Sequence, residues 1–120
     1  MTVPLPSITP EVHDALQARR PVVALESTVI THGLPWPQNL ELARTLETSV
    51  RASGATPATI AVLKGDVRVG LTDAELEYLA QAAGVMKVSR RDFPVAVANR
   101  RDGGTTGRQA GVAWLENGAG

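Results

Sequence analysis

Glu26 is the residue of this 120-residue sequence whose position most favours catalysis. It directly follows VVAL at residues 22–25, a continuous apolar run typical of a strand that is buried on both faces. A carboxyl group at the end of such a strand loses solvent, which raises its pKa toward the range useful for a general acid or base. A carboxylate that caps the next turn or pairs with an arginine would fit the same position, so both interpretations stay open.

Lys87 is one of only two lysines in the chain, against ten arginines. It lies inside a strand-like segment and precedes the cluster SRRD at residues 89–92. Basic side chains near a strand end suit a phosphate group, which arginine binds through its planar fork and lysine as a point charge. A solvated sheet edge protected by charge would show the same residues. The segment around Lys87 is therefore a candidate phosphate site or a charged edge.

The glycine–threonine segment GGTTG at residues 103–107 is a third candidate. Its backbone N–H groups could bind an anion just before a helix. It is not a Walker loop, because no Lys-Ser or Lys-Thr pair follows the glycines, and it does not directly leave a strong strand as a dinucleotide loop does. By itself the pattern favours a flexible loop. His13 and His32 lack metal-ligand spacing, and we expect His32 to shape a loop.

The elements that must position these residues alternate between strand and helix patterns. Strands are predicted at 22–25, 59–63, 67–69 and 85–89, and helices at 10–19, 37–53 and 73–83. The composition of Lys64-Gly65-Asp66 predicts a turn, and Thr72 with Glu75 forms a capping box. This alternation predicts an α/β fold with a largely parallel sheet, in which ligands bind at the carboxyl ends of strands.

Composition excludes several classes of protein. The chain has 12 basic and 12 acidic residues, and this zero net charge argues against a nucleic-acid partner. No apolar run approaches the roughly 18 residues of a membrane span, and no secretory signal is evident, so we expect a cytoplasmic protein with no membrane partner. Without cysteine there is no disulfide and no thiol nucleophile. The low content of aromatic residues predicts a core of marginal stability and an exposed apolar surface.

Five blocks of the sequence occur in a recognisable order. They are Pro21–Asn39, Gly54–Ala61, Val69–Thr72, Lys87–Asp92 and Gly103–Thr106. In this order and spacing they resemble the pseudouridine-5′-phosphate glycosidase family, also called the indigoidine synthase A-like family. Five collinear blocks are far more specific than one short motif. The resemblance implies a three-layer α/β/α core and a homotrimer.

The resemblance also implies an activity, a cofactor and roles for particular residues. Family members reversibly cleave the C–C glycosidic bond of pseudouridine 5′-phosphate, giving uracil and ribose 5-phosphate, and they use a divalent metal, typically manganese. Glu26 would be the proton donor. Lys87 would contact the substrate at its phosphate end, and Thr105, Thr106 and Gly107 would form a further substrate-binding position.

The chain departs from the family pattern in its length. In the family, the lysine that forms a Schiff base with the opened ribose and the aspartate that holds the metal lie downstream of the Gly-Thr-Thr block. We therefore expect residues 1–9 to be a tail, 10–106 to be the N-terminal part of such a domain with an incomplete sheet, and 107–120 to be a divergent tail. No metal ligand is expected in this chain. It would be a truncated glycosidase, inactive alone; the alternatives are a non-catalytic sugar-phosphate-binding remnant and half of a split enzyme.

Overall fold

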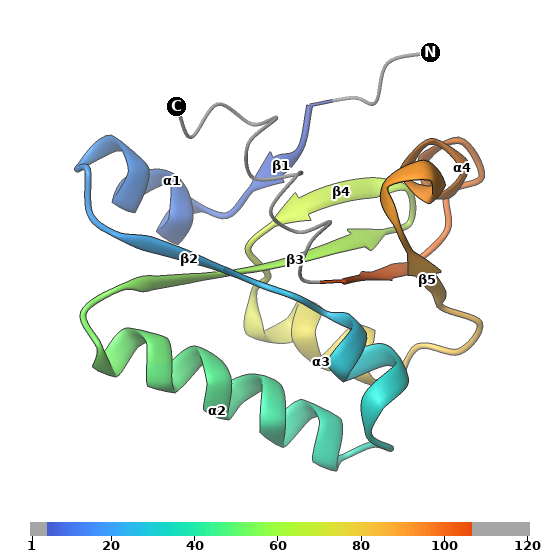
Figure 1. Cartoon of the computed structure of the whole chain (residues 1–120), viewed down its shortest axis with the longest axis horizontal. Coiled ribbons are helices and arrows are strands. Elements are labelled where there is room, and N and C mark those ends of the chain that lie inside the picture. The colour runs from blue at the N-terminus through green and yellow to red at the C-terminus, as the bar shows by residue number, and fades with distance from the viewer. Residues whose placement is uncertain (1–4, 107–120) are drawn as a thin grey trace.

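The computed structural model describes residues 5–106, which form a six-stranded sheet with helices on both faces (Figure 1). The elements in chain order are β1 (Ser7–Ile8), α1 (Pro10–Gln17), β2 (Val22–Leu25), the π-helical turn η1 (Val29–Gly33), α2 (Gln38–Ala52), β3 (Thr56–Leu63), β4 (Asp66–Val69), α3 (Asp73–Gln81), β5 (Met86–Val88), the 3-10 turn η2 (Arg90–Asp92), α4 (Phe93–Ala98) and β6 (Gly103–Thr105).

Two helices begin where their capping residues predict. The Thr9 hydroxyl accepts a hydrogen bond from Val12 N in the first turn of α1, which has a proline at its first position. Thr72 and Glu75 form both hydrogen bonds of the capping box at α3. The predicted starts are therefore confirmed, and α1 ends two residues earlier than expected.

The sheet is mixed, so the prediction of an α/β fold is confirmed but the sheet is only partly parallel. The strand order is β1-β4-β3-β6-β5, and β2 also pairs with β3. The pairs β1–β4, β2–β3 and β5–β6 are parallel, whereas β3 is antiparallel to both β4 and β6. Lys64 and Gly65 join β3 to β4 with positive φ values of 48° and 85°, as a two-residue hairpin turn requires. The turn was expected, but its consequence, an antiparallel pair, was not.

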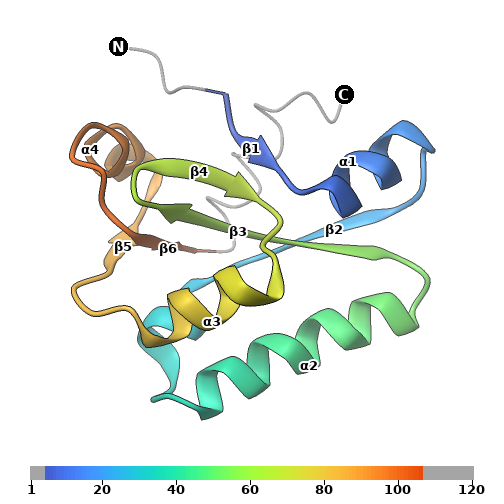
Figure 2. The same cartoon turned by 180° about the vertical axis from the view of Figure 1, so that it is seen from behind.

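A separate apolar core lies on each face of the sheet. The core shared with α1 and α4 includes Val12, Ile60, Val62, Val88 and Phe93. The core on the opposite face, which α2 and α3 cover, includes Ile30, Leu40, Leu63, Leu76 and Leu79. Figure 2 shows α2 and α3 below the sheet and α1 and α4 above it. The described residues thus form the three layers that the resemblance implies.

Two segments differ from their predicted environments. None of the four β2 residues is fully buried, and Val23 is 40% exposed, because β2 pairs within residues 5–106 with β3 alone. Conversely, Gly103–Thr105, expected to be a flexible loop, is the buried strand β6 between β3 and β5. Ser7–Ile8, inside the segment expected to be a tail, pairs with β4. Gly107 and the rest of the segment 107–120 lie outside the described residues.

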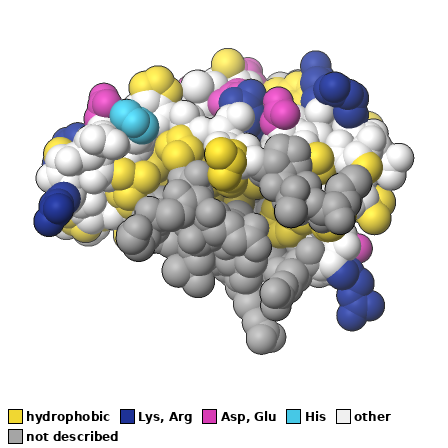
Figure 3. Space-filling view, turned by 90° about the horizontal axis from the view of Figure 1, so that it is seen from above, with side chains coloured by type: hydrophobic (Ala, Val, Ile, Leu, Met, Phe, Trp, Pro, Cys, Tyr) yellow, Lys and Arg dark blue, Asp and Glu magenta, His cyan; other side chains and the backbone are white. Residues whose placement is uncertain are grey.

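The surface carries several exposed apolar side chains. A band of hydrophobic side chains crosses the face that is seen from above (Figure 3). The exposed large apolar residues of the described part are Leu5, Val23, Leu34, Trp36, Leu46, Tyr78 and Val95. They agree with the exposed apolar surface expected from the composition. Among the described helices, none has the length and hydropathy needed to cross a membrane.

Candidate functional site

The carboxyl ends of β2 and β6 meet beside Ile60 of β3. Ser27 N donates to Thr105 O at 2.9 Å, and Thr105 N donates to Ser27 Oγ at 2.9 Å. The Ser27 and Thr105 hydroxyls both donate to Ile60 O, at 2.5 and 2.7 Å. Ser27 and Thr105 are completely buried. This arrangement, called here the Ser27–Thr105 junction, fixes the backbone that carries the neighbouring residues Glu26 and Thr106.

Lys87 lies on β5, the strand beside the junction. β5 and β6 are parallel, with Lys87 in register with Gly104 and Val88 in register with Thr105. Lys87 is exposed, and β5 is the last of the described strands at this end of the sheet. The fold therefore brings three of the sequence blocks together: the end of β2, the end of β6 and the neighbouring strand β5.

The environments of the predicted site residues differ from one another. Glu26 is exposed, so the loss of solvent expected at the end of an apolar strand is not found. The Thr105 hydroxyl donates its hydrogen bond to Ile60 O within the sheet, and Thr106 is half-buried. Gly107 lies outside the described residues. The catalytic role of Glu26 and the substrate contacts of the other residues stay predictions.

Ser27 was missed by the sequence analysis, although it holds the candidate site together. The only signal was a small hydroxyl residue at the point where an apolar strand ends. Such a residue is ordinarily interpreted as the start of a turn. Its partners Ile60 and Thr105 lie 33 and 78 residues away along the chain, so spacing alone could not identify the contact.

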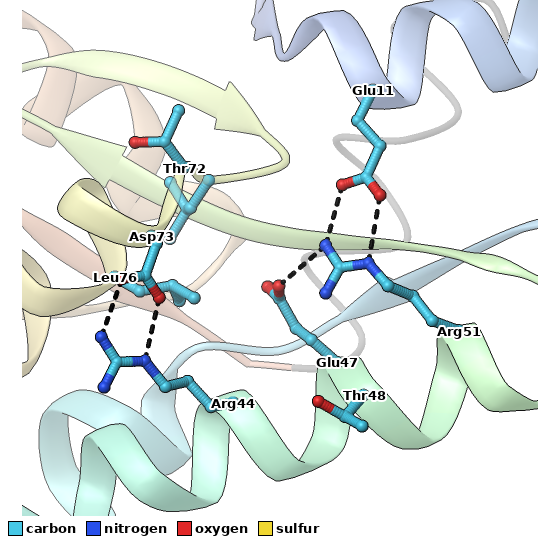
Figure 4. Close-up of a pocket in the computed structure, with 9 residues that line it drawn as sticks. Glu11, Arg44, Glu47, Thr48, Arg51, Thr72, Asp73 and Leu76 are labelled. Carbon is cyan, nitrogen blue, oxygen red and sulfur yellow. Dashed lines mark hydrogen bonds and ion pairs between the residues drawn. The ribbon is translucent and has the colours of Figure 1, made fainter.

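A pocket of about 360 Å³ lies elsewhere, between α2 and the N-terminal ends of α1 and α3 (Figure 4). Arg51 donates two hydrogen bonds to the Glu11 carboxylate, at 2.9 and 3.1 Å. Arg44 donates two to Asp73, at 2.9 and 2.8 Å. The residues that line the pocket are Glu11, Arg44, Glu47, Thr48, Arg51, Leu71, Thr72, Asp73 and Leu76. None of the predicted site residues is among them.

Comparison with known proteins identifies the family. The model of the family described as "Indigoidine synthase A like protein" matches residues 11–119. The chain belongs to the indigoidine synthase A-like family. The match extends through most of 107–120, the segment that was expected to diverge from the family.

Relatives of this indigoidine synthase A-like chain are named as pseudouridine-5′-phosphate glycosidases. The chain is 62% identical over 99 residues to the pseudouridine-5′-phosphate glycosidase of Solibacter usitatus, covering 82% of the chain and 33% of the relative. It is 58% identical over 100 residues to that of Symbiobacterium thermophilum, covering 83% and 32%. The chain therefore spans about a third of the length of these curated relatives.

Two solved structures resemble the fold of this family member. The crystal structure of the prealnumycin C-glycosynthase AlnA in complex with ribulose 5-phosphate is 40% identical, with a TM-score of 0.82, and the match covers 95% of the chain and 36% of AlnA. An indigoidine synthase A-like protein from Thermotoga maritima is 36% identical, with a TM-score of 0.63, covering 72% and 30%.

The described part of this family member offers no place for the manganese ion that the resemblance implies. Within residues 5–106, no group of three or more histidine, aspartate or glutamate side chains could hold a metal ion. Carboxylate oxygens are the side-chain ligands that suit manganese best. The described residues therefore do not fit the metal.

Glu47 differs from the other carboxylates of the pocket. Hydrogen bonds from Arg51 lower the pKa of Glu11, and those from Arg44 lower the pKa of Asp73. Burial raises the pKa of Glu47, even though Thr59 donates a hydrogen bond to its carboxylate at 2.7 Å. Arg51 lies 3.5 Å from the same carboxylate. Folding therefore favours the protonated form of Glu47.

Glu47→Gln is expected to raise the free energy of unfolding at pH 7 and to leave it nearly unchanged at pH 4. The pKa of Glu47 is higher in the folded chain than in the unfolded chain, so the wild type loses stability as the pH rises from about 4.5 through the folded pKa. Glutamine resembles the protonated acid and still accepts from Thr59. Urea unfolding at both pH values measures the difference. Glu77→Gln, at an exposed position of α3, is the control. A Glu47→Gln variant less stable than wild type at pH 7 would contradict the prediction.

Proposed function

We propose that this chain supplies the Glu26, Lys87 and Thr105–Gly107 part of a pseudouridine-5′-phosphate glycosidase. That enzyme reversibly cleaves the C–C glycosidic bond of pseudouridine 5′-phosphate to uracil and ribose 5-phosphate. The name of the 62% identical relative supports the reaction. The observation that supports the proposal is the Ser27–Thr105 junction, in which the neighbour of Glu26 is hydrogen-bonded to the neighbour of Thr106. Thr105 lies on β6, the strand that pairs with the strand of Lys87.

The proposed roles follow from the chemistry of the side chains. Lys87 is an exposed ammonium group at the sheet end and can bind the phosphate as a point charge. Glu26 exchanges protons with the ribose during ring opening. A bond to C5 of uracil cannot leave through protonation of a ring nitrogen, so cleavage requires an electron sink such as a Schiff-base lysine.

The second lysine of this chain does not lie at the Ser27–Thr105 junction. Lys64, the only other lysine, lies in the β3–β4 turn with its ammonium group 5.4 Å from the centre of the Tyr78 ring. We therefore propose that the 120 residues bind ribose 5-phosphate and do not cleave pseudouridine 5′-phosphate alone. In the whole enzyme we propose a cytoplasmic homotrimer, as the resemblance implies.

Binding and turnover separate the candidate functions. We expect ribose 5-phosphate to bind the 120-residue chain, and Lys87→Ala to weaken binding about tenfold, the scale of one charge-assisted hydrogen bond. Lys64→Ala, the matched control, should leave the dissociation constant unchanged. Calorimetric titration measures both. The ribulose 5-phosphate in the AlnA complex favours sugar-phosphate recognition by this fold.

Uracil release, followed by its absorbance, tests the second half of the proposal. We expect none from pseudouridine 5′-phosphate with the 120 residues alone. Release by this chain would contradict that expectation. Turnover regained on mixing with a separate polypeptide that carries the lysine and the aspartate would establish the split enzyme instead. Binding without turnover under any mixture would favour the non-catalytic remnant.

A further inference from the structure

The turn η1, which follows Glu26, carries a histidine whose two ring nitrogens both have partners. His32 Nδ1 lies 2.6 Å from Thr31 Oγ1, and His32 Nε2 lies 3.2 Å from Val85 O. A carbonyl oxygen only accepts, so Nε2 carries the proton of the neutral ring. Nδ1 is then an acceptor, and the Thr31 hydroxyl, which also lies 3.4 Å from Ser27 O, donates to Nδ1 at the shorter distance. His32 thereby links η1 to the residue just before β5.

Thr31 connects the same turn to the rest of the site. Thr31 N donates to Ser27 O at 3.1 Å. Its side chain fills the space above Gly104, where an added Cβ would overlap Thr31 Oγ1 and lie 3.1 Å from Thr31 Cβ. Gly104 is the register partner of Lys87. The absence of a side chain at this strand position thus admits Thr31 against β6.

We infer that Thr31 and His32 form a clasp that positions the segment after Glu26 against the strand that carries Lys87, and that His32 is a positioning residue of the sugar-phosphate site. The contacts of the clasp reach Ser27, Gly104 and Val85, which come from three parts of the chain. All three adjoin the proposed site: Ser27 follows Glu26, Gly104 precedes Thr105, and Val85 precedes Lys87 by two residues. The functional role rests on the proposed function, whereas the clasp itself does not.

The exposure of His32 distinguishes a clasp from ordinary core packing. The residue is exposed, so its ring adds little buried apolar area to either core. What its removal takes away is the hydrogen bond between η1 and Val85, together with the bond to Thr31 within the turn. We therefore expect a local loosening of these two segments, which changes ligand affinity more than the stability of the whole chain.

The test compares His32→Ala and His32→Gln with His13→Ala in the full 120-residue chain. His13 is the other histidine, an exposed residue of α1 whose ring lies 3.7 Å from Asp14. Loss of the clasp should weaken ribose 5-phosphate binding about five- to tenfold, the scale of one lost hydrogen bond. Glutamine can still donate to Val85 O, so it should bind within about twofold of wild type. His13→Ala should bind as wild type does.

Hydrogen exchange of the amides in residues 27–33 and 85–88 gives a readout that needs no ligand. We expect faster exchange there in His32→Ala than in wild type, and near-normal exchange in His32→Gln. Nitrogen NMR of the wild-type imidazole should show the proton on Nε2. If the wild-type chain binds no ribose 5-phosphate, the proposed function is contradicted. The amide exchange rates still test whether the clasp exists, because they need no ligand. Unchanged amide exchange in His32→Ala would overturn the clasp, and so would an exchange rate in His32→Gln as fast as in His32→Ala. Faster exchange in His32→Ala with an unchanged dissociation constant for ribose 5-phosphate would overturn the role of His32 at the site.

Discussion

Ser27→Ala is expected to lower the free energy of unfolding by about 2 kcal/mol, the cost of leaving a buried hydrogen-bonding group without a partner. The Ser27 hydroxyl donates to Ile60 O and accepts from Thr105 N, and both Ser27 and Thr105 are completely buried. Alanine would leave Thr105 N without this acceptor in a place that water does not reach. Ile60 O would keep the hydrogen bond from the Thr105 hydroxyl, which limits the loss.

Urea unfolding of wild type, Ser27→Ala and Ser53→Ala measures this effect. Ser53 also donates its hydroxyl to a backbone carbonyl, Val50 O at 2.6 Å, but it is exposed after α2. Water replaces the lost bond there, so we expect a change within about 0.5 kcal/mol. Equal losses at the two positions would show that the Ser27–Thr105 junction contributes nothing beyond an ordinary surface hydrogen bond.

Gly103→Ala is expected to destabilise the chain by about 2–3 kcal/mol through overpacking. A Cβ at Gly103 would overlap Val88 Cγ2, with Val88 Cβ 3.5 Å and Val62 Cβ 3.6 Å away. Val88 is completely buried in the core beside α4, and its β-branched side chain has few rotamers to choose from. The direction of the change in stability is informative, because replacing a glycine within a strand by alanine ordinarily raises the free energy of unfolding.

A double-mutant cycle with Val88→Ala tests the cause. Removing the Val88 methyl groups makes room for the new Cβ, so the two substitutions should offset each other by about 1 kcal/mol or more. Gly33→Ala is the matched control, since the nearest atom to its added Cβ would be Val29 Cγ2 at 3.5 Å, an ordinary contact. Strictly additive losses in the cycle would contradict a clash between residues 88 and 103.

The local elements were predictable because their signals lie within a few residues. Thr9 with Pro10 marks the start of α1, and the capping box at Thr72 marks α3. The turn at Lys64-Gly65 was also recognised from composition. The sheet arrangement was not, because a strand's direction relative to its neighbours depends on how each connection folds back. The short β6, made of two glycines and a threonine, has no propensity that identifies it as a strand.

The candidate site was predicted only in part, for the same reason. Glu26 and Lys87 were noticed from their positions after or inside apolar segments. Ser27 and Thr31 were not, since their importance lies in contacts with Ile60, Thr105 and Gly104. The environment of Glu26 was also misjudged, because β2 lies at the margin of the described sheet and leaves that carboxylate exposed.

The family, the starts of α1 and α3, the turn at Lys64-Gly65 and the residue types available for chemistry could all be predicted from the linear sequence. These features depend on short sequence motifs and on the order of the motifs along the chain, which are the same whether or not the chain is folded. Folding in three dimensions was needed to bring the ends of β2 and β6 together at Ser27 and Thr105, 78 residues apart. It was also needed to bring His32 to Val85, 53 residues away. Hydrogen bonds act over a few ångströms of space, so partners that are distant along the chain become visible only when the chain is folded.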